Sequence, residues 1–190
     1  MKKVAILIAE GFEDVEAILV ADFCSRADID VDLLSTTDEM QVKSAHGIKV
    51  KCEKLIWDAK VKKYDLVYLP GGLKGAKNLR DSKDVSKFIK KAVEEEVIVA
   101  ALCASPMVLD HLKLLNEGKF TCYPGIEDNL KEKPDLNQTL VKDENIWTGM
   151  GPMFVPQMAF AIIEELKGKE VADRIKEETL YMRLEEEICK

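Results

Sequence analysis

Four short segments of almost wholly apolar residues constrain the fold more than any other feature. Residues 4–8, 31–34, 66–69 and 97–102 are bounded by turn-forming or polar residues and are predicted to be strands. Strands that are apolar on both faces belong to a parallel sheet covered by helices on each side. Residues 83–95 and 154–166 have the apolar spacing of such helices. The sequence therefore predicts an α/β fold with a mostly parallel sheet.

Other segments predict smaller elements. Weaker apolar runs at 120–122, 139–141 and 146–148 predict further strands, and residues 170–190 predict one or two helices. Residues 41–50 predict a small β-hairpin excursion. No repeat or Gly/Ser linker interrupts the chain, so we expect a single domain over residues 1–190.

Composition and charge exclude several classes of protein. Hydrophobic residues make up 47% of the chain, too many for a disordered protein. The net charge of −7, without a basic cluster, argues against nucleic acid as a partner. We find no apolar run of membrane-spanning length and no signal peptide, so we expect a soluble cytoplasmic protein without a membrane partner.

The cysteines lack the spacing of a disulfide framework or a metal site. They are Cys24, Cys52, Cys103, Cys122 and Cys189. An odd number of unpaired thiols is typical of a reducing compartment. With two histidines in the chain we expect no metal site, and without a dinucleotide or P-loop motif we expect no cofactor.

Cys103 follows an apolar strand directly, and Pro106 suits the first turn of a helix after it. Such a junction is of the nucleophile-elbow type, and a helix N-terminus lowers the pKa of a nearby thiol. The sequence therefore predicts a reactive, low-pKa Cys103. A buried cysteine that packs as a small hydrophobic residue is the alternative, which we favour for the other four.

Two further features point toward the same crevice. Gly71 and Gly72 end another core strand, and the backbone N–H groups of Gly72 and Ala104 are candidates for an oxyanion hole. A plain glycine turn is the alternative. Glu16 heads an apolar helical stripe, where burial would raise the pKa of its carboxyl and allow a hydrogen bond to Cys103. A glutamate that extends to water at the edge of the stripe is the alternative.

Three motifs in this order resemble the ThiJ/PfpI superfamily, and within it the ThiJ-like clade that includes Parkinson disease protein 7. They are EGFEDVE at 10–16, LPGG at 69–72 and AALCASP at 100–106. Further similarity at 78–79, 151–152 and 159–172 extends the resemblance over nearly the whole chain.

The resemblance implies a flavodoxin-like three-layer sandwich that forms a homodimer. It implies an oxidation-sensitive Cys103, a protonated Glu16, and backbone donors at Gly72 and Ala104. Arg26 falls where the clade has a pocket arginine. His46 falls where the clade usually has another arginine, on a hairpin that approaches the partner's site.

The chain also departs from its relatives. Peptidase-type members have a histidine directly after the nucleophile, where this chain has Ala104. Some members have a histidine where this chain has Tyr123, which is a pocket residue and a poor base at neutral pH. Met150 replaces a pocket-rim arginine. Peptidase or amidase activity is therefore the least favoured reading.

Two functions remain open at this stage, and both use Cys103. In one, Cys103 and Glu16 act without a cofactor on α-oxoaldehydes such as methylglyoxal, as a glyoxalase or deglycase. In the other, the protein is no enzyme, and oxidation of Cys103 by peroxide makes it a redox sensor or a redox-regulated chaperone. Both place the protein in carbonyl or oxidative stress.

Overall fold

The computed structural model describes residues 1–188. Its strands are β1 (Lys3–Ile8), β2 (Asp30–Ser35), β3 (Gln41–Lys43), β4 (Lys49–Lys51), β5 (Lys54–Leu55), β6 (Leu66–Leu69), β7 (Ile98–Leu102), β8 (Leu140–Asp143) and β9 (Ile146–Gly149). Its α-helices are α1 (Asp14–Arg26), α2 (Leu73–Asp81), α3 (Lys83–Glu94), α4 (Pro106–His111), α5 (Val155–Lys167), α6 (Lys169–Glu178) and α7 (Tyr181–Ile188). Cys189, for which we expected no reactivity, lies outside the described residues.

The main sheet is mostly parallel, as the apolar runs predict. Its strand order within residues 1–188 is β5-β2-β1-β6-β7-β9-β8, and only β8 runs antiparallel to its neighbour. Val4 pairs with Val31 of β2 and with Leu66 of β6, which places β1 in the interior of the sheet. Residues 4–8 of β1 are all buried, so both of its faces are covered.

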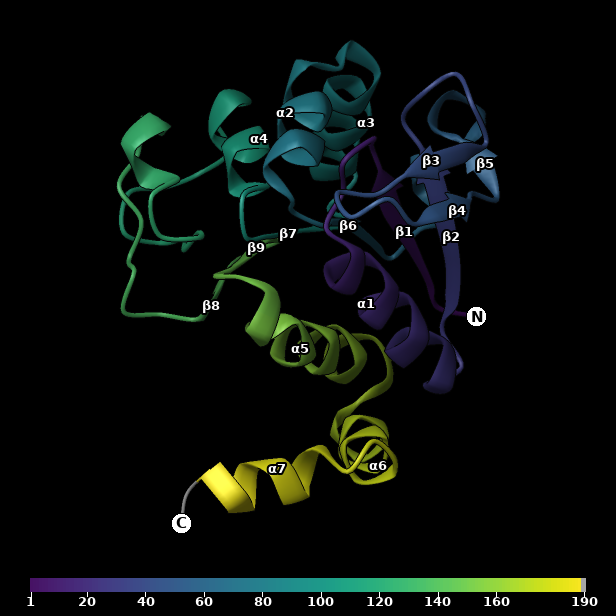
Figure 1. The fold of residues 1–190 in the computed structure, drawn as a ribbon, viewed down its shortest axis with the longest axis vertical. Coiled ribbons are helices and arrows are strands. Elements are labelled where there is room, and N and C mark those ends of the chain that lie inside the picture. The colour runs from purple at the N-terminus through teal and green to yellow at the C-terminus, as the bar shows by residue number, and fades with distance from the viewer. Residues whose placement is uncertain (189–190) are drawn as a thin grey trace.

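Helices cover the sheet on both faces. Figure 1 shows α2, α3 and α4 on one side and α1 and α5 on the other, with α6 and α7 beyond α5. Along β1, Val4, Ile6 and Ile8 pack in the core under α1 and α5. Ala5 and Leu7 pack in the core under α2, α3 and α4. This three-layer arrangement confirms the predicted fold class.

The smaller elements agree with the sequence in most places. The hairpin β3–β4 forms a separate two-stranded antiparallel sheet, and residues 169–188 form two helices. The strand predicted at residues 120–122 is wrong. Phe120 and Cys122 are buried, but residues 120–122 form no strand. The Thr121 amide donates to the side-chain hydroxyl of Thr148 and not to a backbone carbonyl of a neighbouring strand. Within residues 1–188, no helix has the length and apolar character to cross a membrane.

Three neighbouring strands end at one place on the sheet. β1, β6 and β7 lie side by side and parallel. α1, the glycine loop and Cys103 follow the carboxyl ends of these strands. In sheets of this kind the carboxyl ends form the crevice where ligands bind. The topology therefore brings together three segments that are distant in the sequence.

Candidate functional site: a cysteine and a buried glutamate

Cys103 lies in a tight turn between β7 and α4. Its φ is 61°, in the left-handed region that side chains other than glycine rarely adopt. Two backbone hydrogen bonds hold it there. The Cys103 amide donates to the Gly149 carbonyl at 2.9 Å, and the Cys103 carbonyl accepts from the Tyr123 amide at 2.8 Å. Such a conformation costs about 1–3 kcal/mol and persists only where the surroundings impose it.

The loop after β6 packs directly against this turn. A Cβ atom on Gly71 would lie 2.7 Å from the Cβ of Cys103 and 2.7 Å from Oε2 of Glu16. Gly72 has a φ of 82°, and a Cβ there would lie 2.6 Å from the Gly11 carbonyl oxygen. Any side chain at either position would displace the reactive groups or the backbone beside them.

Glu16 is fully buried in the first turns of α1, although it is ionisable. Its Oε2 accepts a hydrogen bond from the Gly71 amide at 2.6 Å. Its Oε1 has no nitrogen or oxygen partner among the described residues. Burial raises the pKa of Glu16 to about 7, although hydrogen bonds with Gly71 and Cys103 oppose the shift. Glu16 can therefore donate or accept a proton near neutral pH.

Burial also raises the pKa of the Cys103 thiol above its ordinary value. The charge of Glu16 and a hydrogen bond with it raise this pKa further, while the amides of Gly72 and Ala104 lower it. The expectation of a low-pKa thiol is therefore wrong. The half-buried sulfur faces a carboxylate, and α4 has only six residues. These effects outweigh the backbone donors.

Both pKa values are raised, and the two groups form one coupled ionisable pair. Two negative charges cannot form cheaply in this buried space, so Glu16 loses its proton first, near pH 7, while Cys103 keeps its own. The arrangement suits a reaction in which the thiol attacks while Glu16 accepts its proton.

Ser105 is a site residue that the sequence analysis missed. Its buried hydroxyl donates to the Pro70 carbonyl at 2.6 Å and ties the cysteine turn to the glycine loop. Its place two residues after Cys103 was the available signal, but the hydrogen bond depends on a segment 35 residues away.

Tyr123 lies at the rim of the site. Its amide is bonded to the Cys103 carbonyl, and a Cβ on Gly151 would lie 3.0 Å from its ring. Its side chain is 48% exposed, so it borders solvent. Met150, on the segment that precedes this glycine, is held by a backbone hydrogen bond to Thr139.

His46 lies in the β3–β4 hairpin, near the start of α1. Its Nδ1 lies 2.8 Å from Asp14 and 3.6 Å from Glu13. Ser44 also donates to Asp14, which fixes the hairpin on this helix end. Single ligand-type atoms of Glu13, Asp14 and His46 all lie within 4.8 Å of one another. This geometry is that of an ion pair.

Arg26 is not brought to Cys103 by this chain. It ends α1, whereas Glu16 lies near its start, and ten residues of helix span about 15 Å. The Arg26 guanidinium instead pairs with Asp22 at 2.9 Å on the exposed face. Within one chain, the pocket role implied for Arg26 has no support from its position.

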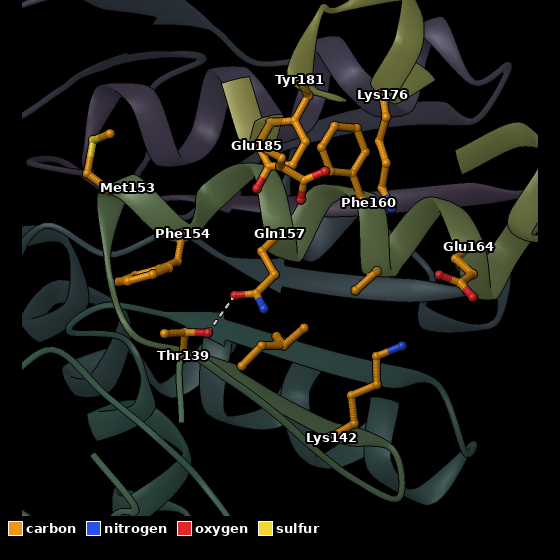
Figure 2. Close-up of a pocket in the computed structure, with 12 residues that line it drawn as sticks. Thr139, Lys142, Met153, Phe154, Gln157, Phe160, Glu164, Lys176, Tyr181 and Glu185 are labelled. Carbon is orange, nitrogen blue, oxygen red and sulfur yellow. Dashed lines mark hydrogen bonds between the residues drawn. The ribbon is translucent and has the colours of Figure 1, made fainter. Parts of the chain in front are cut away.

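A groove lies away from this site, between α5, α7 and the edge strand β8. Figure 2 shows Gln157 of α5 pointing toward Thr139, with which it shares a hydrogen bond of 2.8 Å. Tyr181 of α7 packs on Phe160 with a ring separation of 4.8 Å. The lining of this groove includes neither Glu16 nor Cys103.

Comparison with known protein families decides the relationship. The DJ-1/PfpI family model matches residues 2–165. The chain belongs to the DJ-1/PfpI family. The Parkinson disease protein 7 homolog of Danio rerio is 31% identical over 179 residues, covering 92% of this chain and 95% of that protein. The structure of oxidised Toxoplasma gondii DJ-1 matches with a TM-score of 0.88 at 31% identity, over 95% of this chain and 98% of that one.

Other DJ-1 relatives differ in length or carry an activity in their name. The chain spans 40% of Protein DJ-1 homolog B from Arabidopsis thaliana, to which it is 34% identical over 90% of its own length. The "Glutathione-independent glyoxalase DJR-1.2" of Caenorhabditis elegans is 28% identical, over 87% of this chain and 88% of that protein.

Proposed function

We propose that this DJ-1/PfpI protein converts α-oxoaldehydes such as methylglyoxal to hydroxy acids, with Cys103 and Glu16 as its catalytic residues and no cofactor. The burial of Glu16 against the Cys103 sulfur carries this proposal, because it raises the pKa of that acid to about 7. The glyoxalase named among the relatives supports the same reaction class.

The first step forms a bond between the sulfur and the aldehyde carbon. Glu16 accepts the thiol proton, and the carbonyl oxygen takes up the electron pair of the broken π bond. The amides of Gly72 and Ala104, which are hydrogen-bonded to the sulfur, are the available donors to this oxyanion. Protonation of the oxyanion gives a hemithioacetal.

The second step moves one proton between neighbouring carbons. Glu16 as carboxylate removes the hydrogen on the carbon bound to sulfur and returns it to the adjacent former ketone carbon. The hydroxyl proton of the hemithioacetal passes to the former ketone oxygen, so that the carbon bound to sulfur becomes the carbonyl. A thioester of the hydroxy acid results, and one water molecule hydrolyses it to lactate and the free thiol. Deglycase-type release of lactate from thiol adducts of methylglyoxal follows from the same steps, because those adducts liberate the free aldehyde.

The test is lactate formation from methylglyoxal by purified protein. We expect wild type to form lactate, and Cys103→Ala and Glu16→Gln to lose at least about 99% of the rate. Cys52→Ala is the matched control, because Cys52 is a buried cysteine for which we expect no role in the reaction. Equal lactate from wild type and Cys103→Ala would refute the mechanism.

A second candidate function is non-enzymatic redox sensing at Cys103, with changed partner binding or holdase behaviour as the output. Cys103 is half-buried, while the other described cysteines are buried, so peroxide reaches its sulfur most easily. One peroxide converts the thiolate to a sulfenate and a second gives the sulfinate, with one water released each time. A protonated Glu16 and the amides of Gly72 and Ala104, which act on the Cys103 sulfur, are the donors that would bind the added oxygens.

Graded peroxide followed by peptide mass analysis tests this candidate. Selective gain of two oxygens on Cys103, lost in Glu16→Leu, is the expected result. Uniform oxidation of all the cysteines contradicts it.

We further propose that the protein acts as a homodimer in a reducing compartment such as the cytoplasm. The four described cysteines are unpaired. Val15 and Ile18 of α1 are exposed apolar residues, and so is Ile48 on the hairpin that Ser44 fixes to Asp14 of α1. We expect Ile18→Glu to halve the mass measured by sedimentation, and Leu184→Glu, an exposed residue on α7, to leave it unchanged.

Peptidase activity of the Cys-His type lacks a histidine beside Cys103 in the described chain. His46 is paired with Asp14, and His111 is exposed at the end of α4. We therefore expect no cleavage of casein or of small amide substrates.

A further inference from the structure

Tyr68 is a buried residue beneath the site that the proposed reaction does not use. It lies in β6, with Ile6 of β1 and Ala100 of β7 beside it in register. Its side chain is fully buried in the core under α1, together with Ala17 and Cys24. The Tyr68 ring therefore packs like a phenylalanine ring, but it carries a hydroxyl into an apolar layer.

The Tyr68 hydroxyl has no hydrogen-bond partner among the described residues. Within residues 1–188, the only other buried side-chain oxygen without a partner is Oε1 of Glu16. An unpaired hydroxyl in a core destabilises the folded state, and phenylalanine would fill the same space without that cost. The hydroxyl therefore adds no stability that phenylalanine would lack.

The groups around Tyr68 are acidic or neutral. The ionisable groups that act on it are Glu16 and Cys24 of α1 and Cys103 after β7. Glu13, one helical turn before Glu16, acts on Glu16 in turn. None of these groups is a cation, so an added negative charge in this layer has no positively charged partner.

Tyr68 remains a neutral donor in this environment. Burial raises its pKa well above the ordinary value of 10.0, and the charges of Glu16 and Cys103 raise it further. Because no acceptor fixes the hydroxyl hydrogen, it is free to rotate toward a negative charge nearby. Charges interact more strongly in such a buried region than in water, so the O–H dipole acts on them without direct contact.

We propose that Tyr68 is a positioning residue whose hydroxyl dipole stabilises the negative charge that Glu16 carries beside Cys103. This role deepens the proposed function and rests on it, since ionised Glu16 is the base that accepts the Cys103 proton. In this proposal β6 influences the ionisation of Glu16 in addition to forming part of the sheet.

The experiment compares wild type with Tyr68→Phe. Cys103 is alkylated with iodoacetamide between pH 5 and pH 9, and its rate is followed on the Cys103 peptide by mass spectrometry. We expect the midpoint of the rate profile to rise by about half to one pH unit in the variant. We expect its thermal midpoint to be equal to that of wild type or higher. A midpoint within about a tenth of a unit of wild type overturns the proposal.

Tyr64→Phe is the matched control. Tyr64 is also buried, but it packs on the opposite face of the sheet and its hydroxyl donates to Asp32 at 2.7 Å. This variant should lose stability and keep the pH midpoint, which is the reverse of the result expected for Tyr68→Phe. An equal rise of the midpoint in both variants overturns the proposal, since it would mark a general loss of packing.

A second variant covers the case in which Tyr68→Phe folds poorly. Tyr68→Leu also removes the hydroxyl, and its fold is checked by circular dichroism before alkylation. The same rise in the midpoint is expected, and an unchanged midpoint counts against the proposal. Lactate formation is measured in parallel. Absence of lactate in wild type refutes the proposed function, whereas an unchanged alkylation midpoint refutes the role of Tyr68.

Discussion

The Gly71 amide donates to the Glu16 carboxylate at 2.6 Å and joins α1 to the loop after β6, across 55 positions of sequence. A Cβ atom at the same position would lie 2.7 Å from the Cβ of Cys103, so only glycine fits there without a shift. Gly71 thus sets the spacing of Glu16 and Cys103 as well as the orientation of the acid.

Gly71→Ala should disrupt both the site and its stability. The new methyl group would lie 2.7 Å from the Cβ of Cys103 and from Oε2 of Glu16, so one of them must move. We expect a loss of about 1–3 kcal/mol in the free energy of unfolding, measured in urea. We also expect the alkylation rate of Cys103 to fall about tenfold or more.

Gly118→Ala provides the comparison for Gly71→Ala. Gly118 has a φ of 72° and nothing within 4 Å of a Cβ, so a methyl group adds backbone strain alone. We expect this variant to lose about 1 kcal/mol and to react normally at Cys103. Equal reactivity of the two alanine variants would contradict the spacing role of Gly71.

The stability of the protein should fall as pH rises through the range where Glu16 ionises. The pKa of Glu16 is raised from 4.5 to about 7 in the folded state. Between these values the folded state binds more protons than the unfolded state, so the free energy of unfolding decreases with rising pH. The Glu16 contribution to this decrease is roughly 3 kcal/mol.

Urea unfolding of wild type and Glu16→Gln at several pH values isolates this contribution. The difference in stability between the two proteins should change steadily from pH 4.5 to pH 7 and then level off. Parallel stability curves over that range would show that the carboxyl is not buried in the folded protein.

Ser105→Ala should loosen the contact between the two loops of the site. The substitution leaves the buried Pro70 carbonyl without its hydrogen bond of 2.6 Å. We expect a loss of about 1–3 kcal/mol by urea unfolding. Ser25→Ala, which removes an exposed hydroxyl bonded to the Ala21 carbonyl within α1, should cost less than about 0.5 kcal/mol. Similar losses in both variants would count against a structural role for Ser105.

The His46 imidazole should titrate above its ordinary pKa of 6.5. A hydrogen bond to Asp14, with the charges of Glu13 and Asp14, raises the pKa of His46. The stabilisation from this pair is therefore complete below pH 6.5 and is lost as pH rises through the folded pKa. NMR titration should show a lower midpoint for His46 in Asp14→Asn, and an unchanged midpoint would mean that the pair does not form in solution.

The central strands were predictable because their chemistry is local. Residues 4–8 and 66–69 are apolar without interruption, and only a strand buried on both faces uses such a run. Residues 120–122 have a similar composition, but they lie in the loop region after α4, where side-chain and turn contacts take up their hydrogen bonds. β5 has two residues and offers no pattern to detect.

The site was predictable in position more than in chemistry. Topology alone brings Glu16, Gly72 and Cys103 to one edge of the sheet. The sign of the Cys103 pKa shift depends on how deeply the sulfur is buried and on the charge that faces it, and neither is encoded in the local motif. The contact between Ser105 and Pro70 is likewise visible only after β6 and β7 have paired.

The placement of the site on β1, β6 and β7 has a consequence for protein synthesis. A nascent chain of one hundred residues contains Glu16, Gly71 and Gly72 but not Cys103. Even after Cys103 has emerged, its sulfur remains an ordinary one until three strands from separate stretches of chain lie in register. Turnover of an aldehyde by a nascent or refolding chain would thus mark the moment at which the middle of the sheet closes.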